Sequence, residues 1–366
     1  MIRADEVSTW LYQAALPLWR TAGFDHATGT VWEALDHSGT PVRTCNRRLR
    51  VQLRQAASFA MLGEVRLGRQ LFEWVMTNGF DPDTGQMAAL LSPQMKILTA
   101  PNDLYDLAFA GFAAAALIQA GEDVTQALSR IEAAIDSLRV DQGWAEAATH
   151  PLPRRQNPHM HLFEMSLDLY KATGASRFLT MAETCLNLYK TVFLQPDGRV
   201  LEYYDADLVP LSGPEQSVEP GHMAEWIFLL DRYEVVTGQS CGLEFNTIWH
   251  AVDARRDPTG LLPDHSDPVG KTRRLWPQTE LLKAMCVMHH KGTVKADAIW
   301  EVFERMWSAY FTPQAAGGWY DKRRIEDGAL LSDVMPASTF YHIVIALETL
   351  VSLSGRASER PALPVI

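Results

Sequence analysis

The stretch from Gln156 to Glu164, QNPHMHLFE, carries an amide, two imidazoles and a carboxylate around one proline. Three more stretches combine similar side chains: PGHMAE at residues 220–225, WPQTE at 276–280 and YH at 341–342. Histidine has an unperturbed pKa of about 6.5, so its imidazole can give or take a proton near neutral pH. If these side chains meet in space, they indicate proton transfer on a bound substrate. A metal site and ordinary helix starts are the alternatives.

The stretches stand at the beginnings of segments with helical periodicity, beside a proline. Five segments begin in this way, near Pro101, Pro158, Pro220, Pro277 and Pro336. Proline is tolerated in a first helical turn because its missing N–H has no partner to lose there. Any one polar residue in such a place can also be a helix cap, a satisfied buried group or a carboxylate favoured by the helix dipole. The recurrence in five successive units favours function.

A repeat explains how these helix starts could converge. Turn-forming stretches recur with glycines 55 to 62 residues apart, and helix-period segments, usually two per unit, lie between them. The repeating glycines are Gly29, Gly85, Gly143, Gly198, Gly260 and Gly318. Twelve helices in six hairpins can stack into a closed toroid. The sequence therefore predicts an all-α (α/α)6 barrel with short β-hairpin-like connections, as a single domain over residues 1–366. An open solenoid is the alternative.

In such a barrel, alternate helices run parallel and form an inner ring whose N-terminal ends meet at one mouth. The sixth inner helix would be RRLRVQLRQ, which offers Arg48, Arg50 or Arg54. The predicted funnel is lined by one of these arginines and by Tyr105, Asn157, His161, His222, Glu225, Trp276, Glu280 and His342. This concentration of titratable groups is typical of an active site. His250, His289 and His290 lie away from these helix starts and are interpreted as plain surface or core residues.

Composition excludes several classes of function. The net charge of −11 argues against a nucleic-acid or anionic-membrane surface, which needs excess lysine and arginine. The longest apolar run, near Phe109–Ile118, is about half a membrane span. The four cysteines are widely spaced, which predicts neither disulfides nor a thiolate zinc cluster and fits a cytoplasmic protein. We find no nucleotide-binding fingerprint, and we expect no cofactor.

The motifs NPHMHLFE, PGHMAEW, WPQTE and the late YH resemble those of the N-acylglucosamine 2-epimerase superfamily, in order and approximate spacing, over nearly the whole chain. The family includes N-acylglucosamine 2-epimerases, cellobiose 2-epimerases and mannose isomerases. The resemblance implies an (α/α)6 barrel. It also implies catalytic roles for His222, His342, His161 and Arg54, and substrate-binding roles for Tyr105, Asn157, Glu225, Trp276 and Glu280. His159 stands at a position that is often not histidine in the family, so it receives no role.

The implied chemistry starts with removal of the proton α to a carbonyl of an open-chain sugar. His222 and His342 would be the acid–base pair, and Arg54 would stabilise the developing oxyanion. His161 would serve ring opening, and Glu225 would fix the tautomer of His222. WPQTE in its RRLWPQTE context resembles the mannose isomerase and mannose-6-phosphate-isomerase-like members. We therefore expect metal-independent interconversion of mannose and fructose. Sugar 2-epimerisation and mannose-6-phosphate isomerisation remain alternatives, and a homodimer remains open.

The same residues are compatible with three alternative functions. A metal-dependent isomerase would use His159, His161 and His222 as ligands. A glycoside hydrolase would need two carboxylates from Glu164, Glu225 and Glu280. A non-catalytic sugar-binding or scaffold protein would bind without proton exchange. Arg154 and Arg155, next to the first motif, suggest a sugar-phosphate contact, although a solvated face is the more ordinary interpretation of two adjacent arginines.

Overall fold

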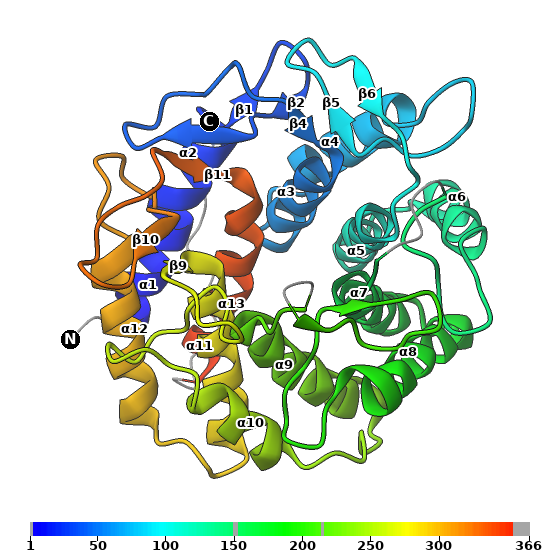
Figure 1. Cartoon of the computed structure of the whole chain (residues 1–366). Coiled ribbons are helices and arrows are strands. Elements are labelled where there is room, and N and C mark those ends of the chain that lie inside the picture. The colour runs from blue at the N-terminus through cyan, green and yellow to red at the C-terminus, as the bar shows by residue number, and fades with distance from the viewer. Residues whose placement is uncertain (1–2, 149–152, 214–215, 354–366) are drawn as a thin grey trace.

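Six roughly parallel helices form a closed inner ring in the computed structural model, which describes residues 3–148, 153–213 and 216–353. Each inner helix contacts the next, and the last, α13, contacts the first, α3, so the ring has no open edge (Figure 1). The inner helices are α3 (Leu49–Met61), α5 (Leu104–Gln119), α7 (Gln156–Thr173), α9 (Pro220–Thr237), α11 (Leu275–His290) and α13 (Phe340–Ser352). The predicted (α/α)6 barrel is confirmed, and the open solenoid is excluded.

An outer layer of helices covers the ring, with polar residues outward and apolar residues against the inner helices. These helices are α4 (Val65–Asn78), α6 (Thr125–Asp136), α8 (Ser176–Leu188) continued by the π-helix η2 (Tyr189–Phe193), α10 (Phe245–Asp253) and α12 (Ala296–Tyr310). The sixth outer member is the N-terminal segment α1 (Ala4–Trp10), η1 (Leu11–Ala15) and α2 (Leu16–Arg20), in which α1 packs on α13. The two ends of the described chain thus form the sixth hairpin and close the barrel.

Short antiparallel strands connect the helices at the end where the inner helices begin. They are β1 (Phe24–Asp25), β2 (Thr30–Val31), β3 (Ala34–Asp36), β4 (Arg47–Arg48), β5 (Leu90–Leu91), β6 (Ile97–Thr99), β7 (Arg154–Arg155), β8 (Tyr203–Tyr204), β9 (Thr272–Arg274), β10 (Lys322–Arg324) and β11 (Val334–Pro336). They pair as β1–β2, β4–β5–β6, β7–β8, β9–β10 and β3–β11. In the last pair Leu35 lies opposite Met335, so strand pairing also joins the two ends of the chain.

The repeating turns are as predicted in five of six units. Gly29, Gly85, Gly143, Gly198 and Gly260 all have positive φ, which a residue without a Cβ adopts at little cost. In the sixth unit the left-handed residue is Gly317, not Gly318, because the chain there reverses one residue earlier against the backbone of Ala14.

The prolines divide into two groups. Pro158, Pro220 and Pro277 lie within the first three residues of their helices, as predicted. Pro101 and Pro336 instead stand just before α5 and before the 3-10 turn η4 (Ala337–Thr339). In all five cases the proline marks the same mouth of the barrel.

Helix α4 approaches α3 so closely that glycine is required at Gly68. A Cβ there would lie 2.6 Å from the carbonyl oxygen of Ala56. Alanine normally favours a helix over glycine by about 1 kcal/mol, yet we expect Gly68→Ala to lower the free energy of unfolding by roughly 1–3 kcal/mol. Chemical denaturation measures this change. Gly111→Ala is the comparison, because the nearest atoms there are Sδ of Met165 and its Cγ at 2.7 Å, in a side chain that can change rotamer, whereas the carbonyl of Ala56 belongs to the backbone. Equal or greater loss in Gly111→Ala would contradict the argument.

Candidate active site

Every inner helix places at least one of the predicted residues near its N-terminal end. Arg54 comes from α3, Tyr105 from α5, Asn157 and His161 from α7, His222 and Glu225 from α9, Trp276 and Glu280 from α11, and His342 from α13. Side-chain contacts join Tyr105 to Arg54 and His161, and the ring of Trp276 stands beside both His222 and His342. The predicted set therefore converges on one mouth of the barrel.

His342 is oriented by Glu280. Its Nδ1 lies 2.8 Å from Oε1 of Glu280, whose other oxygen lies 2.5 Å from Nζ of Lys283. Burial, followed by the charges of Arg54 and Lys283, lowers the pKa of His342 well below its usual value. An ionised Glu280 accepts the Nδ1 proton, which leaves the lone pair on Nε2. His342 is thus a neutral imidazole with one nitrogen available as a base.

His222 has the opposite charge state. Its Nδ1 lies 2.9 Å from Oε1 of Glu202 and 3.6 Å from Oε2 of Glu219. Although burial alone would lower it, the charges of Glu202 and Glu219 raise the pKa of His222 to about 10. His222 is therefore an imidazolium at neutral pH and can act as an acid. Its ring centroid is 5.0 Å from that of Trp276, and the centroid of His342 is 5.6 Å from Trp276.

Glu225 does not hold His222, which corrects the sequence interpretation. Glu202, just before β8, takes that place and also accepts hydrogen bonds from Gln156 Nε2 at 3.0 and 3.2 Å. Glu225 is fully buried and its oxygens have no hydrogen-bond partner in the described chain. It points instead into a group with Glu280 and His342 and into another with His161 and Glu164. Burial and then the charge of Glu280 raise the pKa of Glu225 to about 7.

His161 is fixed from behind by a carboxylate, as His342 is. Its Nδ1 lies 3.1 Å from Glu164, and the same carboxylate accepts a hydrogen bond of 2.6 Å from the hydroxyl of Tyr341. Burial opposes the charge of Glu164, yet the hydrogen bond and charge of His161, with the charge of Lys283, hold the pKa of Glu164 at about 2. The His161 ring packs beside Tyr105, with 4.9 Å between the ring centroids.

Arg54 is held against aromatic rings. Its guanidinium donates to the hydroxyl of Tyr105 at 2.5 Å and to the carbonyl of Ser338 at 3.3 Å, and it lies 4.2 Å from the centre of the Phe109 ring. Only 6% of Arg54 is exposed, and no carboxylate within ion-pair distance neutralises it in the described chain. A fixed, uncompensated guanidinium can stabilise an oxyanion.

The substrate-binding candidates divide by exposure. Tyr105, Asn157 and Trp276 are half-buried, and Oδ1 of Asn157 has no hydrogen-bond partner among the described residues. Glu225 and Glu280 have no exposed surface. Their contact with a sugar remains a prediction, but their contacts in this structure are with the protein.

His159 has no place in the site, as expected from the sequence, and the alternative metal set that would use it fails, as do the phosphate-binding and solvated interpretations of the arginine pair. His159 points away from His161: its Nε2 accepts from the backbone N–H of Trp144, and its Nδ1 lies 3.1 Å from the carbonyl of Arg155. It cannot join the predicted metal set. Arg154 is buried and donates to backbone carbonyls, and Arg155 pairs with Glu146 and Asp103. Both arginines stabilise β7 and its surroundings.

Sequence reasoning missed Glu202, Glu219, Lys283 and Tyr341. The i,i+3 spacing of Glu280 and Lys283 was readable as a helical ion pair. No sequence pattern connects Glu202 to His222, because the two residues are 20 positions apart and belong to different elements.

Three groups in the described chain have the side chains for a cation, and all of their members except the partly exposed Glu219 are buried: His161–Glu164–Glu225, Glu202–Glu219–His222 and Glu225–Glu280–His342. In each of them the histidine Nδ1 already lies within hydrogen-bond distance of a glutamate. Lys283 and the imidazolium of His222 supply positive charge to two of these groups.

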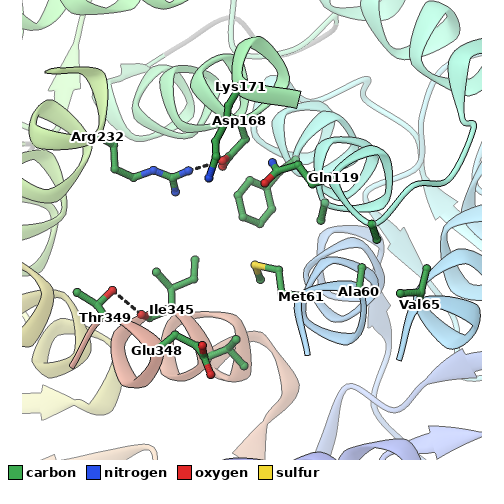
Figure 2. A pocket seen from close by; sticks show the side chains of 14 residues that line it. Ala60, Met61, Val65, Gln119, Asp168, Lys171, Arg232, Ile345, Glu348 and Thr349 are labelled. Carbon is green, nitrogen blue, oxygen red and sulfur yellow. Dashed lines mark hydrogen bonds and ion pairs between the residues drawn. The ribbon is translucent and has the colours of Figure 1, made fainter. Parts of the chain in front are cut away.

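The opposite mouth of the barrel holds a cavity of about 530 Å³ with different chemistry. Figure 2 shows Arg232 paired with Asp168 on one side, with Met61, Gln119 and Glu348 around the space. Its lining contains no histidine. The histidines that the sequence singled out therefore lie at the other mouth, where the inner helices begin.

No helix in the described ranges is both long and apolar enough to cross a membrane. The profile of the N-acylglucosamine 2-epimerase (GlcNAc 2-epimerase) family matches residues 30–346. A protein of Rhizobium meliloti (strain 1021) named mannose-6-phosphate isomerase is 32% identical over 94% of this chain and 96% of its own.

Among solved structures, a D-mannose isomerase superposes with a TM-score of 0.82 at 17% identity, over 96% of this chain and 97% of its own. The cellobiose 2-epimerase of Spirochaeta thermophila DSM 6192 superposes with a TM-score of 0.80 at 19% identity, also over 96% and 97%. At these identities the two structures support the fold.

Proposed function

Because the chain belongs to the N-acylglucosamine 2-epimerase family and is a sugar isomerase or epimerase, we propose that it interconverts D-mannose and D-fructose without a metal ion. The observation that carries this proposal is a pair of histidines beside Trp276 in different protonation states, each held at Nδ1 by its own carboxylate. His222 is protonated and His342 is neutral at the same pH. Aldose–ketose isomerisation needs such a pair, since a proton must leave carbon while another reaches the carbonyl oxygen.

The mechanism uses one base for carbon and one acid for oxygen. Nε2 of His342 takes the proton from C2 of open-chain mannose while His222 gives its proton to O1. The product of this step is a cis-enediol. The proton on His342 exchanges with solvent while the enediol is bound; His342 then protonates C1, and His222 recovers a proton from O2. In net terms C1 gains a proton where C2 lost one and O1 gains one where O2 lost one, which yields fructose and restores both histidines.

The remaining residues orient the sugar and stabilise charge. Arg54 donates to the oxyanion that develops as the C2 proton leaves. His161, held by Glu164, assists ring opening. Tyr105, Asn157 and Trp276 contact the sugar, with the indole as an apolar platform. Glu280 and Glu225 lie behind the histidines, and we assign them to positioning and charge balance rather than to direct contact.

The mouth favours a neutral sugar over a sugar phosphate. Arginines bind phosphate through free guanidinium donors. Arg48, Arg50 and Arg155 pair with Glu33, Asp106 and Glu146 respectively. Two arginines of the inner-helix starts have no side-chain ion pair in the described chain: Arg54, which Tyr105 and the carbonyl of Ser338 hold, and Arg274, which stands near Glu219 and Asp321. One guanidinium beside two carboxylates is a poor phosphate site.

A 2-epimerase is the second candidate, and it has its own observation. His222 and His342 both stand beside Trp276, so they can address the sugar from two sides. If Arg54 stabilised the intermediate as an enediolate and His222 gave its proton to C2 from the face opposite His342, instead of to O1, the aldehyde would be restored with C2 inverted and the product would be glucose. The family resemblance and the geometry are compatible with both outcomes, which diverge after the same enediol.

Proton NMR of D-mannose incubated in D2O with and without EDTA separates these outcomes. We expect fructose with deuterium on C1, formed at the same rate when EDTA is present, because Lys283 and His222 supply the positive charge of the site. Glucose as the first product would replace the isomerase by the epimerase. Loss of activity with EDTA, restored by a divalent ion, would contradict metal independence. Turnover of mannose 6-phosphate but not mannose would contradict the argument for a neutral sugar.

A further inference from the structure

We infer that Lys283 is a positioning residue of this site, which holds Glu280 in its ionised form and thereby keeps the lone pair of His342 on the nitrogen that faces the sugar. The inference rests on the proposed role of His342 as the base. It concerns a residue that the sequence did not single out and that cannot touch the sugar, since none of its surface is exposed.

A fully buried lysine needs an explanation. Its Nζ lies 2.5 Å from Oε2 of Glu280 and 4.5 Å from the centre of the Phe228 ring. Taking an ammonium and a carboxylate out of water costs several kcal/mol for each ion. Apolar residues of similar size would fill the same space without that cost. A role in setting the charge of Glu280 explains why the pair is there.

The tautomer of His342 depends on the charge of Glu280. An ionised carboxylate can only accept, so Nδ1 of His342 keeps its proton and Nε2 keeps its lone pair. A protonated Glu280 would donate to Nδ1, and the ring proton would then sit on Nε2. In that tautomer His342 has no lone pair to receive the C2 proton. The same logic governs an aspartate that orients a catalytic histidine in hydrolases.

The surroundings of Glu280 make this charge fragile. The groups that act on Glu280 from the neighbouring helices are Glu164 of α7, His222 and Glu225 of α9, and Tyr341 and His342 of α13, while Arg54 of α3 and His161 of α7 act on His342 beside it. Two of these are carboxyls that repel a third negative charge. Burial raises the pKa of Glu280 to about 7, and the charge of Lys283 is the largest effect that opposes the rise. Without Lys283, Glu280 would take up a proton at neutral pH.

The test is the pH dependence of turnover in Lys283→Met. The acidic limb of kcat should follow ionisation of Glu280, near pH 7 in the natural protein. In the variant we expect this limb to move to higher pH by about one unit, so that kcat at pH 7 falls about fivefold and recovers near pH 9. KM should change by less than about twofold, since ground-state contacts with the sugar are untouched.

Two further variants separate positioning from damage to the fold. Lys291→Met removes the same charge beyond the end of α11, where Lys291 pairs with Asp231 and Glu234, and it should leave the limb unmoved. In a Glu280→Gln background the amide has no charge to hold, so adding Lys283→Met should leave the acidic limb of kcat where Glu280→Gln alone puts it. The inference would be overturned if the two substitutions lowered kcat independently, so that their effects multiplied in the double variant. It would also be overturned if raising the pH to 9 did not restore the kcat of Lys283→Met.

A readout without turnover distinguishes this inference from the proposed function. In protein labelled with ¹⁵N-histidine, His342 should show an unprotonated Nε2 in the natural protein and a protonated Nε2 in Lys283→Met at pH 7. His342→Asn assigns the signal. Absence of proton exchange in natural protein would reject the isomerase, whereas an unchanged tautomer in Lys283→Met would reject the role of Lys283 alone.

Discussion

His342→Asn should lower kcat for mannose by about 10³-fold and abolish exchange of the C2 proton with solvent, because asparagine has no group that can take a proton from carbon. Asparagine is smaller than histidine and its amide can still donate to Glu280, so the buried carboxylate keeps a partner. We expect KM to change little. Deuterium incorporation measured by NMR over several days would detect the residual rate.

His290→Asn is the control for this substitution. His290 is exposed at the end of α11, away from the mouth, and the same change there should leave both turnover and exchange intact. If His342→Asn still exchanged the C2 proton at a rate within tenfold of the natural protein, His342 would not be the base. His222 would then be the remaining candidate among the two histidines beside Trp276.

Glu202→Gln should move the alkaline limb of the activity profile to lower pH. The charges of Glu202 and Glu219 raise the pKa of His222 to about 10, so the natural enzyme should lose its acid, and its activity, only as pH approaches 10. Removing the nearer carboxylate lowers that pKa. We expect the limb to fall by about one to two units, which lowers kcat at pH 9 by about twofold to tenfold. Initial rates between pH 6 and 10.5 measure this shift.

Glu219→Gln provides a graded comparison. Its carboxylate is 3.6 Å from Nδ1 of His222, against 2.9 Å for Glu202, so its removal should shift the limb less. The free energy of unfolding should also fall at alkaline pH, for the same reason as the activity. A histidine whose pKa is raised on folding contributes stability fully below its unfolded pKa of about 6.5, and the contribution disappears as pH rises through about 10. Both variants lower the pKa of folded His222, so the stability that protonated His222 contributes should be lost at a lower pH than in the natural protein. An alkaline limb unchanged in Glu202→Gln would show that another group sets it.

The architecture was predictable because it repeats. Helical periodicity and the turn glycines are properties of residues close in sequence, and Gly29, Gly85 and Gly143 adopt the predicted backbone. The unit recurs often enough for the number of helix pairs and the closed ring to follow. The prolines also indicated which mouth would gather the polar residues. Gly318 shows the limit of this reasoning, since the left-handed turn moved to the neighbouring Gly317.

The sequence identified the residues that gather at this mouth, but it did not identify the hydrogen bonds between them. Arg54, His161, His222 and His342 were identified from their motifs, and the barrel brings their helices together. Sequence spacing suggested Glu225 as the partner of His222, whereas a loop residue far along the chain, Glu202, holds it.

The sequence by itself determined that six inner helices would carry histidines, carboxylates and one arginine to a common mouth, since side-chain direction along a helix follows from its period. Only the tertiary structure decided which histidine is charged. That difference depends on distances between separate elements: Glu202 and Glu219 stand against His222, whereas Arg54 and Lys283 stand near His342. Electrostatic interactions in a buried site change steeply over a few ångströms, and local sequence carries no measure of such distances.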